Sequence, residues 1–127
     1  MKTLLKHTKI IILTTILCWA SYGIYAQKET EVFIPLGKSP GVSGKYSVMG
    51  KVGTVNTVDS TITIAQDATN KTIKITAGTE IYLDKSKLKL TNKKGSFADI
   101  KEGLMVEAKY KNNKPDGLIE WLKVQLE

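Results

Sequence analysis

Apolar and polar side chains alternate along most of the chain after residue 45, and this period of two is typical of β-strands with one buried face. The first such stretch covers residues 45–58, and its apolar positions change parity near Gly53. A parity change inside a strand indicates a β-bulge, which bends the strand. The pattern therefore predicts a long, bent first strand.

The same alternation predicts four further strands. Residues 104–110 give the clearest pattern, with Glu107 on the face that is expected to lie in water. In the last strand the parity changes near Trp121, which predicts a second bulge. A short apolar run at residues 81–83 follows the third strand. The predicted strands after the first are centred on residues 62–64, 73–75, 104–110 and 119–126.

A short helical turn is predicted between strands three and four. Ser96 can cap it and Gly103 can end it. The order is then three strands, one helical turn and two strands, which favours an all-β fold, specifically a small five-stranded OB-like barrel. A bent first strand is what a sheet needs if it is to close on itself. The alternative is an open β-sandwich or meander, because alternation alone does not fix closure.

The N-terminus is typical of a signal peptide helix. Lys2, Lys6 and Lys9 precede an apolar run at residues 10–20, and small residues follow. The run is shorter than the roughly 20 residues that span a bilayer, so we expect cleavage, after Ala26 or after Gly23. An uncleaved anchor is the alternative. The expected product is exported, to the periplasm or the medium, and has no spanning helix.

The predicted organisation has three parts, of which the middle one is a linker arm. Its prolines and glycines argue against a helix. Residues 32–34 are apolar and could add a short edge strand, which Pro35 would end. The three parts are a signal peptide at residues 1–26, the linker arm at 27–44 and the OB-like domain at 45–127.

Composition excludes most familiar catalytic chemistry from the mature chain. The only histidine, His7, and the only cysteine, Cys18, both lie in the predicted signal peptide. Without them there is no disulfide, no Cys or His nucleophile system, no Ser/His/Asp triad and no ordinary zinc or copper site. We therefore expect a protein that is not an enzyme and that uses no cofactor and no metal.

Every basic side chain is a lysine. Three of the 19 lysines lie in residues 1–26 and all 12 acidic residues follow, so the mature part has a net charge of +4. Without arginine the chain lacks the planar fork that reads guanine edges. Sequence-specific nucleic-acid binding is therefore not expected, whereas weak, salt-sensitive attraction to anionic surfaces is.

One cluster of lysines is a candidate contact surface for a polyanion such as an acidic polysaccharide, lipid headgroups or nucleic acid. The simpler interpretation is a solvated hairpin, because Asp84 adjoins the cluster and no aromatic side chains are interleaved with it. Another exported protein is an alternative partner. The cluster consists of Lys85, Lys87, Lys89, Lys93 and Lys94.

Other candidate residues have simpler interpretations. A glycosidase needs two carboxylates at a defined separation, but Glu107, Asp116 and Glu120 are also what the polar face of a sheet supplies. No acidic residue lies in a loop of calcium-binding pattern. Four aromatic residues are expected in the core or at its rim rather than in a binding surface. They are Tyr46, Tyr82, Tyr110 and Trp121.

Short segments spread over residues 34–125 resemble a group of small exported bacterial domains of unknown function with an OB-like pattern. The resemblance implies an OB-like fold and assigns no catalytic residue. It rests on residues 34–37 (IPLG), 39–46 (SPGVSGKY), 50–52 (GKV), 83–88 (LDKSKL), 97–103 (FADIKEG), 106–110 (VEAKY) and 120–124 (EWLKV).

Overall fold

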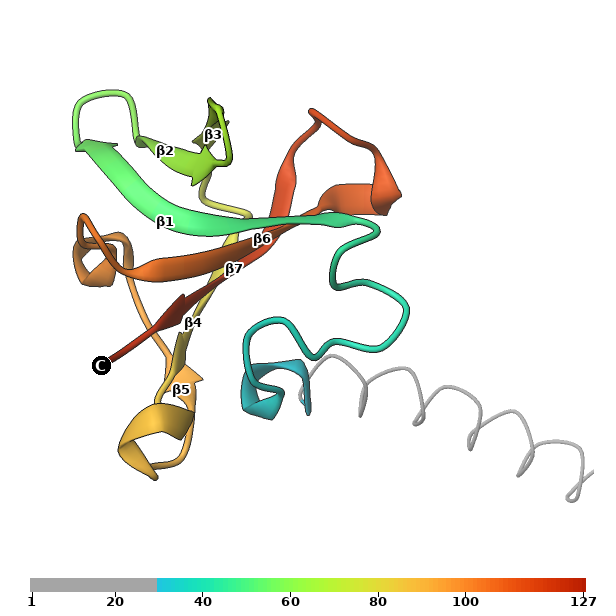
Figure 1. Ribbon diagram of the computed structural model, residues 1–127, viewed down its shortest axis with the longest axis vertical. Helices are drawn as coiled ribbons and strands as arrows, with labels where there is room; N and C mark the ends of the chain where they lie inside the picture. The colour runs from blue at the N-terminus through green and yellow to red at the C-terminus, as the bar shows by residue number, and fades with distance from the viewer. Residues whose placement is uncertain (1–29) are drawn as a thin grey trace, which may run out of the picture. The chain divides into compact units, whose positions relative to one another are not determined.

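The computed structural model describes residues 30–127. The predicted signal peptide and its cleavage sites lie outside the described residues. The strands form a single sheet in the order β3-β2-β1-β6-β7-β4-β5, with β3 and β5 at its two ends (Figure 1). All neighbours are antiparallel except β4 and β7. The strands are β1 (Ser47–Asn56), β2 (Thr61–Gln66), β3 (Thr69–Lys74), β4 (Glu80–Asp84), β5 (Lys93–Lys94), β6 (Met105–Tyr110) and β7 (Ile119–Gln125).

The all-β fold class is confirmed, but the five-stranded barrel is not what the sheet order shows. Seven strands are present in the described part, and the sheet is not closed. The two additional strands are β4, which the sequence showed only as a short apolar run, and β5, which has two residues. All but one of the β4 residues are buried, so this strand has no period-two pattern to detect.

Both predicted bulges are present. The pairing of β1 with β2 shifts register between Val52 and Val55, on either side of Gly53. The pairing of β6 with β7 shifts between Lys109 and Tyr110, which leaves Glu120 as an extra residue next to Trp121. The extra residues reverse the parity of the side chains that follow them.

The main core lies on one face of the sheet. Most of its side chains come from the alternate positions that the pattern marked as apolar. β4 adds Ile81 and Leu83, and the predicted helical turn adds Ile100. That turn is a single 3-10 turn, η3 (Phe97–Asp99). The core includes Val48, Val52, Ile62, Ile64, Ile73, Ile81, Leu83, Ile100, Val106, Ala108, Leu122 and Val124.

At Gly50, β1 passes close to β2. A Cβ atom there would overlap the Ala65 carbonyl oxygen and the Ile64 side chain. Since a backbone carbonyl cannot rotate away, we expect Gly50→Ala to lower the free energy of unfolding by about 1–3 kcal/mol. Urea denaturation measures this. Gly78→Ala is the matched control, because its nearest neighbour would be Thr76 Oγ1 at 3.8 Å, and equal losses in the two variants would contradict the prediction.

A second layer covers the opposite face of the sheet. Residues 32–46, here named the strap, run across it in a series of turns, and Val32 is buried with Tyr82 and Trp121. The strap begins within the 3-10 turn η1 (Glu31–Phe33), so the edge strand predicted at residues 32–34 is wrong. Burial of Val32 beside two aromatic rings stabilises a turn here without any strand partner.

Candidate functional site

The predicted lysine cluster lies in the loop that joins β4 to β5, residues 85–92, and continues into β5. We name residues 85–94 the lysine loop. Its turn, η2 (Ser86–Leu88), ends at Lys89, which has the left-handed φ of 56°. The Asn92 side chain is buried and accepts a hydrogen bond from the Lys85 N–H at 2.7 Å. The loop therefore has a defined shape and does not depend on its lysines for its fold.

The structure brings all five lysines to this one loop. Lys85 is half-buried, and the other four are exposed. Two of them lie near surface carboxylates from other parts of the chain: the Lys87 ammonium is 3.8 Å from the Glu127 carboxylate, and the Lys94 ammonium is 4.0 Å from the Glu80 carboxylate. Exposed pairs at such distances contribute little, so the charges remain available to an external anion.

Two leucines of the same loop are also exposed, and the sequence analysis did not single them out. Leu88 is 41% exposed and Leu90 is 55% exposed. Large apolar side chains in water among lysines form a mixed surface with positive charge and apolar contact area. The alternation of lysine and leucine over residues 87–90 was the available signal.

Asp84 directs its carboxylate to backbone N–H groups, and among the described residues it forms no ion pair with a lysine of the loop. Its carboxylate is buried and accepts hydrogen bonds from the Leu36 N–H at 2.8 Å and the Ser86 N–H at 2.9 Å. Burial by itself would raise the pKa of Asp84, but the hydrogen bonds from Ser86, Leu36 and Gln125 outweigh it and hold the pKa below its ordinary value. The ionised carboxylate therefore connects the strap, through Leu36, to the start of the lysine loop, through Ser86.

Glu107 is fully buried, so its predicted position on the wet face is wrong. Its carboxylate accepts hydrogen bonds from the Gly37 N–H at 2.9 Å and from the Ser47 hydroxyl at 2.7 Å. Directly opposite it on β7 is Lys123, which is also buried. The polar face of the sheet exists as predicted, but the strap covers it. Backbone groups of the strap form hydrogen bonds with the charged side chains of that face.

The three candidate carboxylates do not form a catalytic pair. Glu107 binds the strap, Glu120 is 2.7 Å from Lys109, and Asp116 forms an ion pair with Lys71. Each has its own partner on a different part of the fold. Within residues 30–127, no group of three or more acidic, His or Cys side chains could hold a metal ion.

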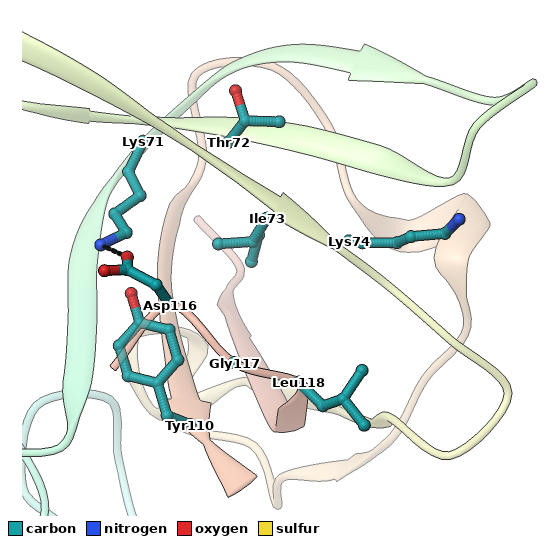
Figure 2. Close-up of a pocket in the computed structure, with 8 residues that line it drawn as sticks. All are labelled: Lys71, Thr72, Ile73, Lys74, Tyr110, Asp116, Gly117 and Leu118. Carbon is teal, nitrogen blue, oxygen red and sulfur yellow. Dashed lines mark ion pairs between the residues drawn. The ribbon is translucent and has the colours of Figure 1, made fainter. Parts of the chain in front are cut away.

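A pocket of about 470 Å³ lies between β3 and the loop that joins β6 to β7 (Figure 2). Lys71, Asp116 and the Tyr110 hydroxyl lie together at one side of it, and Leu118 lies at the other. The Asp116 carboxylate raises the pKa of the Lys71 ammonium, with a smaller contribution from Tyr110. Lys71 and Asp116 are 45 residues apart, so no local motif could have revealed this grouping.

Comparisons of the chain with protein-family models, curated proteins and solved structures find no match. In the part of the chain that the structure describes, no helix is long and apolar enough to cross a membrane. Function must therefore be argued from the two surfaces themselves.

Proposed function

We propose that the protein is an exported, non-catalytic binding module and that the lysine loop is its contact surface for anionic lipid headgroups. The observation that supports this is the exposure of Leu88 and Leu90 among the lysines. With a polysaccharide or nucleic acid, only the lysine charges would contribute to binding. With a lipid surface, the lysines and the leucines both contribute, because leucines can enter the boundary between headgroups and acyl chains.

The expected affinity is weak and depends on salt. Lysines near an anionic membrane contribute about 1 kcal/mol each, so five give about 5 kcal/mol, which corresponds to a dissociation constant in the submillimolar range. Partial burial of two leucines adds to this. Such binding suits an accessory protein that associates reversibly with a surface.

Vesicle binding tests this function. We expect the purified protein to cosediment with vesicles containing phosphatidylglycerol and to be released by high salt, since screening weakens exposed charges. Lys87→Gln/Lys89→Gln/Lys93→Gln should remove most binding, and Leu88→Ser/Leu90→Ser should weaken it on the same vesicles.

The matched control is Lys101→Gln/Lys111→Gln/Lys114→Gln, which removes the same charge from exposed lysines elsewhere. All of these variants keep the same N-terminus, so differences between them report on the lysines and leucines alone. The lipid contact would be refuted if the control variant lost as much vesicle binding as the lysine-loop variant. It would also be refuted if Leu88→Ser/Leu90→Ser bound vesicles as well as the parent.

A structural or protein-interaction module is the alternative, acting through the linker arm or a sheet edge. The arm is the weaker candidate because Val32 is buried against the sheet. The edge strand β3 offers a row of backbone groups, but Lys71 and Lys74 lie on it, and edge lysines oppose pairing with a second chain. These points favour the lysine loop.

We also infer that the sheet is a split version of an OB-like barrel. In support, β3 and β4 are separated by only residues 75–79 and lie near opposite ends of the strand order. The Ile75 N–H donates to the Ser60 carbonyl, and the Thr79 hydroxyl donates to the Ile119 carbonyl. Counted as one interrupted strand, β3 and β4 would border both ends of β2-β1-β6-β7.

A further inference from the structure

One buried carboxylate joins the strap to the start of the lysine loop. Asp84 is 1% exposed, and its two oxygens bind different segments. Oδ2 accepts a hydrogen bond from the Leu36 N–H of the strap, and Oδ1 accepts one from the Ser86 N–H of the loop. Because Asp84 directly precedes Lys85, the direction in which its negative charge points bears on the lysines of the proposed lipid contact.

These contacts do not depend equally on the strap. Ser86 is two residues from Asp84, so this hydrogen bond is a local turn contact. The Gln125 side chain, which also binds the carboxylate, lies on the adjoining strand β7. Leu36 is 48 residues away and reaches Oδ2 only while the strap lies on the sheet. Opening of the strap would therefore free Oδ2 and leave the turn of the lysine loop in place.

A carboxylate freed in this way would act against the lysine loop. It would stay ionised near neutral pH, since the ordinary pKa of an aspartate is about 4. Lys85 and Lys87 follow it closely in sequence, and their long, flexible side chains can turn toward it. The exposed negative charge would attract these ammonium groups and repel anionic headgroups. The closed strap prevents this by binding Oδ2.

The strap can be loosened at a point that lies outside the lysine loop. Val32 is buried with Tyr82 and Trp121, and Val42 packs against the same cluster. Because apolar contact with two aromatic rings stabilises the closed strap, polar side chains at the two valines should favour the open strap. Neither valine belongs to the main core of the sheet.

We propose that the strap regulates the lipid contact by holding the Asp84 carboxylate away from the lysines of the loop. The closed strap is the state that binds anionic lipid, and the open strap weakens binding. This inference rests on the lipid contact proposed above. Because coupling between two equilibria is reciprocal, bound anionic lipid must favour the closed strap by the same factor.

Vesicle binding by strap variants tests the proposal. Val32→Ser/Val42→Ser should bind phosphatidylglycerol vesicles about fivefold more weakly than the parent, which is the effect of one lysine charge near an anionic surface. Adding Asp84→Asn should return the affinity to the parent value or above it, because a neutral amide does not compete for lysines. A merely structural role predicts a further loss instead. Asp67→Asn, at an exposed residue, is the matched control and should not restore binding.

A second measurement needs no open variant. The Gly37 N–H donates to Glu107, so its hydrogen exchange reports opening of the strap without involving Asp84 directly. In the parent, phosphatidylglycerol vesicles should slow this exchange about fivefold, and phosphatidylcholine vesicles should not. In Asp84→Asn, neither kind of vesicle should slow it.

The outcomes separate this inference from the proposed function. A parent protein that does not bind phosphatidylglycerol vesicles refutes the lipid contact, and the regulation is refuted with it. A parent that binds through the lysine loop, but whose Gly37 exchange is unchanged by bound vesicles, overturns the regulation alone. The same holds if Asp84→Asn fails to restore binding by a Val32→Ser/Val42→Ser protein in which Gly37 exchange shows that the strap is open.

Discussion

Replacing Lys123 by methionine is expected to lower the free energy of unfolding by about 3–5 kcal/mol, because it removes a buried positive charge opposite the buried Glu107 and leaves the strap oxygens that it binds without their donor. Lys123 is 1% exposed. Its ammonium donates to the Ile34 carbonyl and to the Ser39 hydroxyl, both at 3.0 Å. It is also the residue opposite Glu107 in the register of β6 and β7, so the substitution removes a positive charge from the same buried face as that carboxylate.

Urea denaturation of a double-mutant cycle checks this explanation. If the loss comes from an uncompensated Glu107, Lys123→Met/Glu107→Gln should be more stable than the sum of the two single losses implies. The control is Lys101→Met, on an exposed lysine, which should change stability little. Additive losses in the cycle would show that the two buried charges act independently.

The hydrophobic pattern predicted five of the seven strands and both bulges, because those features depend on one buried face and local spacing. It showed β4, whose two sides are both buried, only as a short apolar run. It did not predict the strap. Glu107 and Lys123 occupy positions at which polar residues are typical of a solvent-exposed face. That face is buried because residues 32–46 cover it. Tyr82 and Trp121 on the same face were the available signal.

Of the two candidate sites, the sequence predicted only the one whose residues are close together in the chain. The lysine loop could be predicted because its residues are adjacent in sequence, and the structure adds the defined turn and the exposed leucines. The pocket could not be predicted, because it joins Lys71 on β3 to Asp116 in a distant loop. Tyr110 was correctly expected to be buried, but its position beside the ion pair of Lys71 and Asp116 depends on how segments far apart in the sequence pack together.

Replacing Trp121 by alanine is expected to cost about 3–5 kcal/mol, the usual range for a buried tryptophan. This approaches the whole stability of a small domain. Trp121 is 4% exposed, its ring centroid is 6.5 Å from that of Tyr82, and the Lys123 ammonium lies 4.5 Å from its centre. The residue is buried as the sequence predicted, but beneath the strap and not in the main core.

That location makes a second result expected of Trp121→Ala. With the ring gone, Val32 loses its largest neighbour, so the strap should open before the sheet unfolds. Hydrogen exchange of the Leu36 and Gly37 amides, which donate to Asp84 and Glu107, should then become faster than that of sheet amides. Val58→Ala, at a side chain that is 91% exposed, is the control and should change neither measurement. A Trp121→Ala protein that melts like the parent and keeps these amides protected would show that the strap is fastened by its hydrogen bonds to buried charges and not by this apolar contact.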